Sequence, residues 1–434
     1  MKLASVSAFQ GLDVPVVPVV PTGALHPSRT DICFSLSPYT ASMPLDIPAI
    51  QKTLAVDQVD GWLLYDFHGS NPVAVKLAGL VGAHTTRRWY YFIPASGTPK
   101  KLVHVIEPFV LDKVPGDKLT YAGRRQLEQG VAEMLRGSKV VAMEYSPECA
   151  IPYLSRVDAG TVDFIRRLGL RVVSSGDLVQ RFEAAWDDAA IATHRKASEK
   201  LYRIKDRTFE FVGAKLSAGE TPTEYEVQQT MVKWFRDEGL VADSAPIVGA
   251  QENAGNPHYA PTRDNSRTIR PNELLLLDLW GKLDEPGAVY ADITWTGFAG
   301  TPPEPIAKAF GVAVAGRNAA VTKVKSAVAA GQAVHGWEVD RATRDVITAA
   351  GFGDLFIHRT GHSLGEEVHG NGVHMDDYET HDDRLLVPGT GFTIEPGIYT
   401  KEFGVRTEIN MVVGQKSAEV TGPCQETLVR IATR

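Results

Sequence analysis

The sequence of 434 residues predicts an α/β domain followed by an α+β domain that is built from two similar halves. Three observations support this prediction. Short buried strands alternate with a helical segment over residues 46–185, which is typical of α/β folds. A long amphipathic helix predicted at 187–215 follows, and pairs of acid-bearing strands then recur within residues 186–434. At about 150 residues per domain, the length agrees with two or three domains.

Composition and charge exclude several classes of protein. Lys and Arg number 45 and Asp and Glu number 52, so the formal net charge is −7, and no basic block indicates a nucleic-acid partner. No apolar run approaches the roughly 18 residues that a membrane span needs. The three cysteines are odd in number and far apart, which argues against a disulfide framework and indicates a reducing compartment. We therefore expect a cytoplasmic protein with no nucleic-acid and no membrane partner.

Residues 1–45 are predicted to be a flexible extension that belongs to neither domain. A secretory signal needs about 7–15 unbroken apolar residues. Here Asp13, Pro15, Pro18 and Pro21 interrupt the apolar stretch. Proline-rich composition of this kind favours extended chain.

The first domain, predicted over residues 46–185, starts with segments rich in aromatic and β-branched residues, as is typical of buried strands. Apolar residues recur with a helical period from Arg125 to Arg136, which predicts a helix between the last two strands. Four strands are predicted, at residues 59–65, 88–93, 102–106 and 140–143.

Two helix starts with the same chemistry occur in the second domain. Thr221-Pro-Thr-Glu224 places a capping threonine, a proline at the first helical position and a glutamate three residues after the cap. Thr301-Pro-Pro-Glu304 repeats this arrangement later in the chain. The repeat is consistent with an internal duplication.

Two strand pairs that each carry two acids give the stronger repeat. An apolar strand ends on Asp278, and a turn leads to a second strand that carries Asp292. Further along the chain, Glu395 ends a similar strand, and Glu408 follows the next turn. The acids of a pair are 14 positions apart in the first pair and 13 in the second.

Four such acids need a counter-charge. A buried carboxylate without a partner takes up a proton or finds a cation. For any one of these acids, a salt bridge or a role in a turn is the simpler interpretation, but a fourfold set on matching strands indicates a site for two divalent cations. Protonated acids or arginine partners are the alternatives, and Arg406 lies near only one of the acids in sequence.

Histidines cluster between the two strand pairs. A lone histidine is usually a satisfied core or surface residue, whereas three within 12 residues, flanked by glycines, indicate backbone that lies close to a site. We expect His374 and His381, in an Asp-rich stretch, to be solvated loop residues, and His258 lies in a loop that fits either role. The three clustered residues are His358, His362 and His369.

At these residues the sequence resembles the pita-bread metallopeptidases, in the branch that contains aminopeptidase P, prolidase (Xaa-Pro dipeptidase) and creatinase. The motifs that carry the resemblance are Tyr-Ala-Asp-Ile-Thr, Gly-His-Ser-Leu-Gly, Ile-Glu-Pro-Gly-Ile-Tyr and Arg-Thr-Glu-Ile-Asn. The resemblance implies a creatinase-like α/β domain at 46–185 and a pita-bread α+β catalytic domain with pseudo-twofold symmetry at 186–434. It also implies five metal ligands, which match Asp278, Asp292, His362, Glu395 and Glu408.

The resemblance further implies a metallo-exopeptidase that cleaves Xaa-Pro bonds with a water shared by two metal ions, and a homodimer or homotetramer. Four carboxylates and one imidazole suit Mn²⁺, with Co²⁺ or Zn²⁺ as alternatives. Glu395 is expected to take the proton of the water. His258, His358 and His369 match the accessory histidines of the proline-directed members, and Arg406 is expected to position the substrate or a metal ligand.

Several alternatives stay open. The enzyme could be an Xaa-Pro aminopeptidase or an Xaa-Pro dipeptidase. The first two aspartates usually stand closer in the family than the 14 positions seen here, so the substrate could be a non-peptide C–N compound or a phosphotriester. A non-catalytic peptide-binding member would be expected to lose ligands, and none is lost. Arg406 could also be a plain charge partner of Glu408 or Asp292.

Overall fold

The structure is a computed structural model that describes residues 45–433, and the flexible extension predicted at 1–45 falls almost entirely outside them. The described residues cluster as one compact body, so the domain boundary near residue 185 stays a prediction. No helix among residues 45–433 is long and apolar enough to cross a membrane.

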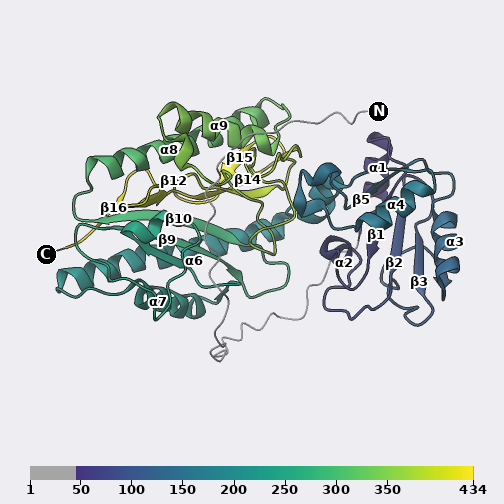
Figure 1. Cartoon of the computed structure of the whole chain (residues 1–434), viewed down its shortest axis with the longest axis horizontal. Coiled ribbons are helices and arrows are strands. Elements are labelled where there is room, and N and C mark those ends of the chain that lie inside the picture. The colour runs from purple at the N-terminus through teal and green to yellow at the C-terminus, as the bar shows by residue number, and fades with distance from the viewer. Residues whose placement is uncertain (1–44, 434) are drawn as a thin grey trace, which may run out of the picture. The chain divides into compact units, whose positions relative to one another are not determined.

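The first domain is a mixed six-stranded sheet in the order β4-β3-β2-β1-β5-β6 (Figure 1). β2 runs antiparallel to both β1 and β3. The other three pairs, β3 with β4, β1 with β5 and β5 with β6, are parallel. The four predicted strands are confirmed, and the short β4 and β6 were missed. The strands are β1 Gly61–Asp66, β2 Trp89–Pro94, β3 Lys100–His104, β4 Asp117–Tyr121, β5 Val140–Met143 and β6 Arg171–Ser174.

Helices cover both faces of this sheet because its central strands are apolar on both sides. In β1, Trp62 and Leu64 enter one core, while Leu63 and Tyr65 enter the other. The helix predicted at 125–136 is confirmed as α3. The helices are α1 Ile47–Val56, α2 Pro72–Leu77, α3 Arg124–Met134, α4 Ala159–Arg167 and α5 Gly176–Val179, with a π-helix at Gln180–Ala184 and 3₁₀ turns at Pro147–Cys149 and Pro152–Leu154.

The second domain begins with α6, Asp188–Ser217, which confirms the predicted long helix. The predicted helix caps are wrong. α7, Glu224–Asp237, is capped by Thr223 with Glu226, because a second Thr-x-x-Glu box overlaps the predicted one and lies two residues later. α8, Glu304–Ala329, follows an extended Pro303 and has no side-chain cap, so Thr301 plays no such role.

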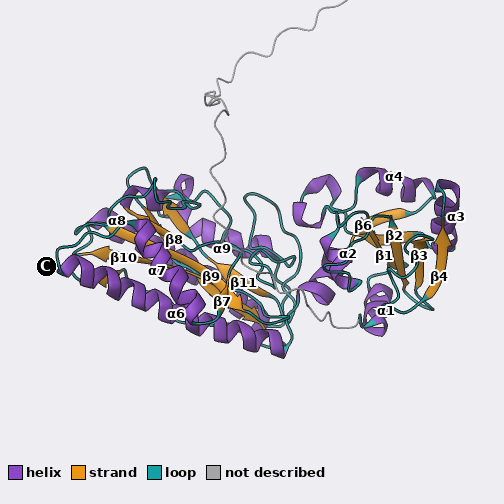
Figure 2. Cartoon of the chain, turned by 90° about the horizontal axis from the view of Figure 1, so that it is seen from below, coloured by secondary structure: helices purple, strands orange, loops and turns teal. Residues whose placement is uncertain are grey.

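Two layers of strands lie between the helix pairs α6/α7 and α8/α9 (Figures 1 and 2). One sheet has the order β16-β10-β9-β7, with β8 also paired to β9, and the others are β11-β14-β15 and β12-β13. The elements are β7 Leu240–Val241, β8 Ile247–Ala250, β9 Leu274–Leu283, β10 Ala291–Ala299, α9 Gly336–Ala349, β11 Gly391–Ile394, β12 Gly397–Tyr399, β13 Gly404–Arg406, β14 Ile409–Val413, β15 Ala418–Val420 and β16 Val429–Ile431, with 3₁₀ turns at Gln251–Gly255 and Gly353–Leu355.

The two halves of this domain meet where β10 and β14 lie side by side. The side-chain oxygen of Asn410 accepts the backbone N–H of Asp292 at 3.0 Å, and the Asn410 amide donates back to the Asp292 carbonyl. One buried side chain thus fixes the distance between the two acid-bearing strand pairs.

Candidate metal centre

The first two acids lie on one face of the β9–β10 hairpin. Asp278 stands directly opposite Thr294, and Asp292 opposite Trp280. Opposed residues of an antiparallel pair point to the same side, so the two carboxylates lie diagonally across the hairpin. Both are buried, with 8% and 4% of their surface exposed.

The other two acids occupy an interruption in the second hairpin. β11 pairs with β14 and β12 pairs with β13, and the two ladders are separated by residues 395–396 on one side and 407–408 on the other. Glu395 and Glu408 therefore lie between strands. The backbone N–H of Glu408 donates to the Thr294 carbonyl at 3.0 Å, which ties this interruption to the first hairpin.

His362 stands between the two acid pairs. Its Nε2 lies 3.5 Å from Asp292 Oδ2 and 3.5 Å from Glu395 Oε1. Its Nδ1 lies 3.1 Å from the Ser363 carbonyl, so Nδ1 carries the proton and Nε2 keeps a free lone pair, as in metal-ligating histidines. Asp292, His362 and Glu408 each offer a ligand atom within 4.8 Å of the others.

Thr294 and Arg406 connect Asp278 to this cluster. The Thr294 hydroxyl lies 3.0 Å from Asp278 Oδ1 and 2.8 Å from Glu408 Oε2. The Arg406 guanidinium forms an ion pair with Asp278, and its Nε and Nη1 donate to Thr294 and to the Tyr399 hydroxyl at 2.9 and 3.1 Å.

The partners expected for Arg406 as a structural residue, Glu408 or Asp292, are wrong, because its ion pair is with Asp278. The cause is the placement of β13. The Thr296 hydroxyl donates to the Arg406 carbonyl at 2.7 Å, which holds Arg406 at the part of β10 farther from Asp292 and next to the Asp278–Thr294 pair.

When its acids are ionised, the site needs more positive charge than Arg406 supplies. Four ionised carboxylates and Arg406 carry a net charge of −3. Burial and Glu408 raise the pKa of Asp292 well above its usual value, burial and Glu395 do the same to the pKa of Glu408, and burial raises the pKa of Glu395 to about 7. Asp292 Oδ1 and Glu408 Oε1 are buried without a hydrogen-bond partner among residues 45–433. Oxygen-rich ligands with unsatisfied lone pairs fit divalent cations.

We expect the affinity for Mn²⁺ to rise at least about tenfold between pH 6 and pH 8, because metal binding must displace protons from these acids. The pKa of Glu395, raised to about 7, lies within this window. Isothermal titration calorimetry in two buffers of different ionisation enthalpy would measure both affinity and proton release. Equal affinities at the two pH values, with no proton released, would contradict the protonated state of the metal-free site.

The accessory histidines are placed differently from one another. His369 packs edge-on against the His362 ring, with centroids 4.4 Å apart, and burial lowers its pKa to about 4. His358 is held by the Tyr399 hydroxyl at 2.8 Å and the Arg359 carbonyl at 2.6 Å, and burial lowers its pKa to about 3. His258 is exposed. Burial raises the pKa of Asp278, and Arg406 is the main group that opposes this rise.

The expectation that His374 is a solvated loop residue is wrong. Its side chain is fully buried, and its Nδ1 accepts the Ser363 N–H at 3.1 Å. A bridge between Gly361 and Met375 draws this loop against the site. The buried apolar residues on either side of His374 are the sequence signal that could have revealed it. His381 is exposed, as expected.

The chain is similar in sequence to several known proteins. The model of metallopeptidase family M24 matches residues 192–415. The chain is 29% identical over 300 residues, 69% of this chain and 72% of the relative, to a probable dipeptidase PepE of Mycobacterium tuberculosis (strain ATCC 25618 / H37Rv). It is 39% identical over 163 residues, 37% of this chain and 40% of the relative, to an Xaa-Pro dipeptidase of Lactobacillus helveticus.

Solved structures show the same fold. Dipeptidase PepE from Mycobacterium ulcerans matches with a TM-score of 0.66 at 24% identity, covering 89% of this chain and 97% of that chain. The prolidase from Pyrococcus furiosus matches with a TM-score of 0.56 at 19% identity, covering 86% of this chain and 99% of that chain.

Proposed function

The chain belongs to metallopeptidase family M24, and on this premise we propose that it is a dipeptidase that cleaves Xaa-Pro dipeptides with two divalent metal ions. Membership confirms the family and the pita-bread fold predicted from the sequence. The observation that carries the proposal is the buried cluster of Asp292, His362 and Glu408, whose ligand atoms lie within 4.8 Å of one another.

We assign the metal ions to the five residues predicted from the sequence. Two divalent cations would change the net charge of −3 to +1, which suits an anionic nucleophile. Mn²⁺ is the first choice because four of the five donors are carboxylates, and Co²⁺ and Zn²⁺ are the alternatives. When bound, such a pair lowers the pKa of a shared water and polarises the scissile carbonyl. The ligands are Asp278, Asp292, His362, Glu395 and Glu408.

Glu395 is assigned as the proton acceptor. Its side chain is 15% exposed, so solvent reaches it, whereas Asp292 has only 6% of its side chain exposed. The Thr393 hydroxyl donates to its Oε1 at 3.2 Å and orients it. A carboxylate that is oriented in this way and reached by solvent can accept a proton from a nearby water.

The remaining predicted residues fall into two groups. His369 and His258 are assigned to the substrate carbonyl and the developing oxyanion. His358 and Arg406 both bond Tyr399, and the Arg406 guanidinium is occupied by Asp278, Thr294 and Tyr399. We therefore assign these two as positioning residues.

Arg359 favours short substrates with a free carboxylate. It is 9% exposed, its Nη1 donates to the Tyr153 hydroxyl at 2.7 Å, and it forms no ion pair with any residue in 45–433. Its charge is close enough to counteract the rise in the pKa of Glu395 that burial causes. The C-terminal carboxylate of a dipeptide would supply the anion that this guanidinium lacks.

After reconstitution with Mn²⁺, Gly-Pro should be hydrolysed with a kcat/KM at least about tenfold higher than Gly-Pro-Pro. Proline and Pro-Pro release would be measured by chromatography over a panel of increasing length. Arg359→Gln should raise KM for Gly-Pro, whereas Arg341→Gln, an exposed arginine on α9, should not.

Other outcomes would change the assignment. Cleavage of Gly-Pro-Pro alone would make the protein an Xaa-Pro aminopeptidase. If neither peptide is hydrolysed although metal is bound, a non-peptide substrate would be favoured. The long turn between Leu283 and Ala291 is the reason for testing that alternative. Absence of metal by elemental analysis would favour a peptide-binding protein. A homodimer or homotetramer in the cytoplasm stays part of the proposal, and sedimentation would test the assembly.

A further inference from the structure

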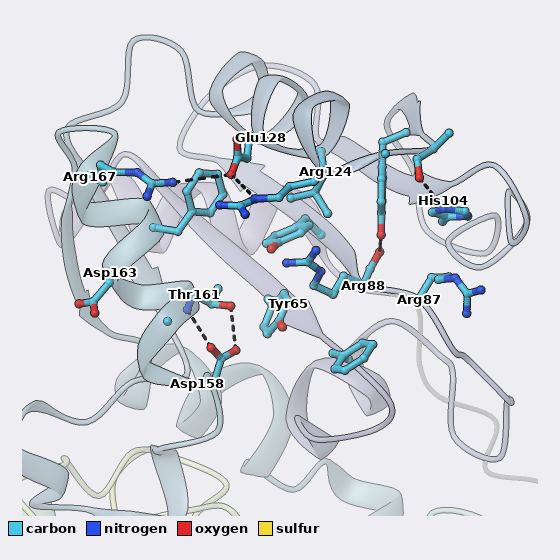
Figure 3. A pocket seen from close by; sticks show the side chains of 18 residues that line it. Tyr65, Arg87, Arg88, His104, Arg124, Glu128, Asp158, Thr161, Asp163 and Arg167 are labelled. Carbon is cyan, nitrogen blue, oxygen red and sulfur yellow. Dashed lines mark hydrogen bonds and ion pairs between the residues drawn. The ribbon is translucent and has the colours of Figure 1, made fainter.

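A second concave site lies in the first domain, between α3 and α4 and over the carboxyl ends of β1, β3 and β4 (Figure 3). The cavity has a volume of about 970 Å³, which falls in the range of small-molecule sites. Ligands of α/β sheets bind at the carboxyl ends of the strands. All lining residues lie between Tyr65 and Arg167, so none of them belongs to the candidate metal centre.

An arginine without a partner faces this cavity. Arg88 is half-buried, and its side chain makes no ion pair and no hydrogen bond with residues 45–433. Its charge counteracts the rise in pKa that burial causes in Tyr65, Tyr90 and Tyr121. A partly desolvated guanidinium is normally paired, so its isolation indicates an anion that the chain does not supply.

Tyr90 also lines the cavity. Its side chain is only 1% exposed, and its hydroxyl, which is not fully buried, makes no hydrogen bond with residues 45–433. The neighbouring Tyr121 differs, because its hydroxyl donates to the Arg88 carbonyl at 2.7 Å. A ligand with polar atoms would satisfy Tyr90.

The amino end of α3 points to the same cavity. α4 is capped by Asp158, whose oxygens accept from Thr161 at 2.8 and 2.7 Å, as Figure 3 shows. α3 begins after Gly123, which has no side chain to cap it. The Gln126 side-chain oxygen accepts the backbone N–H groups of Ala122 and Gly123 at 2.8 and 3.3 Å, and the N–H groups of the first turn itself have no side-chain acceptor among residues 45–433. Such an end binds anions, phosphate in particular.

Two further arginines add positive charge at the wall. Arg124 and Arg167 lie 3.0 and 3.8 Å from the same carboxylate oxygen of Glu128, so two guanidiniums share one counter-charge (Figure 3). The cavity therefore has excess positive charge on the side where α3 begins, while Asp158 is engaged by its own helix.

We propose that this cavity binds a small organic phosphate that carries a planar ring, of the class of nucleoside monophosphates. The phosphate would lie on Arg88 and on the amino end of α3, and the ring would lie against the tyrosine side chains. The volume exceeds what inorganic phosphate alone would fill, and the aromatic lining suits the ring. The proposal does not depend on the reaction at the metal centre.

Calorimetry on the full chain with AMP, inorganic phosphate and adenosine tests this. AMP should bind most tightly, and Arg88→Gln should weaken it at least about tenfold. Arg125→Gln is the matched control, because Arg125 lies on the same helix outside the cavity lining, and it should leave AMP binding unchanged.

A stabilising variant keeps the test independent of folding. In Gly123→Asp, the added Cβ would meet nothing within 4 Å, and φ of −116° accepts any residue. Aspartate is a preferred N-cap, so the melting temperature should hold or rise while its carboxylate repels the phosphate and AMP binding falls at least about tenfold. Unchanged AMP affinity in Arg88→Gln and Gly123→Asp, or no AMP binding at about 5 mM, would overturn the proposal. Equal affinity for AMP and inorganic phosphate would overturn its organic part.

Discussion

Replacing Glu395 with glutamine is expected to lower kcat for Gly-Pro by about 10³-fold or more while the metal ions stay bound. Glutamine keeps the length of the side chain and one oxygen donor, but its amide cannot accept a proton. General-base catalysis contributes on the order of 10²–10⁴ in rate. The loss should fall on kcat rather than KM, because substrate binding does not require the proton transfer.

The control for this variant is Glu402→Gln, an exposed glutamate in the turn between β12 and β13, which should keep full activity. Metal content by elemental analysis and kcat by proline release would be measured on both proteins. Full residual activity in Glu395→Gln would reject the proton-transfer role. Loss of metal together with activity would show that Glu395 acts chiefly as a ligand.

The strands and the gathering of the acids could be predicted because both follow from local patterns. The apolar run up to Asp278, the turn after it and the acid-bearing strand of Asp292 are visible in a single sequence. The expected end of the first strand at Asp278 is wrong, because β9 continues to Leu283. Their diagonal placement depends on register, in which Asp278 opposes Thr294, and register is set by the whole hairpin. Thr294, which bridges two carboxylates, was therefore missed.

Predictions failed where tertiary contacts decide the outcome or where the sequence shows no apolar pattern. Thr221 and Thr223 both begin a Thr-x-x-Glu box, and tertiary contacts selected the second: the backbone N–H of Glu224 donates to the Arg267 carbonyl at 3.0 Å. β4 was missed because it is mostly polar and exposed, so no apolar alternation marks it. His374 was misplaced because its burial depends on the bridge between Gly361 and the adjacent Met375, which a single sequence does not reveal.

The partner of Arg406 shows a further limit. Arg406 is close to Glu408 in sequence, which suggested that the two form an ion pair. In the structure β13 is held beside Thr296, and the Arg406 guanidinium lies next to Asp278 instead. The ion pair with Asp278 offsets one of four carboxylates and leaves three. Arginine therefore lowers the demand for cations without removing it, which is why a metal pair remains the proposed partner of the site.

Replacing Arg406 with methionine is expected to destabilise the metal-free protein by about 3–5 kcal/mol, the usual cost of removing one partner of a buried ion pair. Asp278, 8% exposed, would be left beside three other acids. Burial alone would lower the pKa of Arg406, but Asp278 and the neighbouring acids raise it well above its usual value, so the guanidinium stays charged at any working pH.

With Mn²⁺ bound, the loss of stability should be smaller, because two divalent cations would leave the variant site neutral rather than negative. Unfolding would be followed with EDTA and with Mn²⁺, using Arg430→Met as the control, since Arg430 is exposed on β16. The same variants separate two roles in kinetics. A residue that holds Asp278 and Tyr399 in place affects kcat, whereas one that binds the substrate raises KM. Equal destabilisation with and without Mn²⁺ would contradict the charge balance from which the metal pair is inferred.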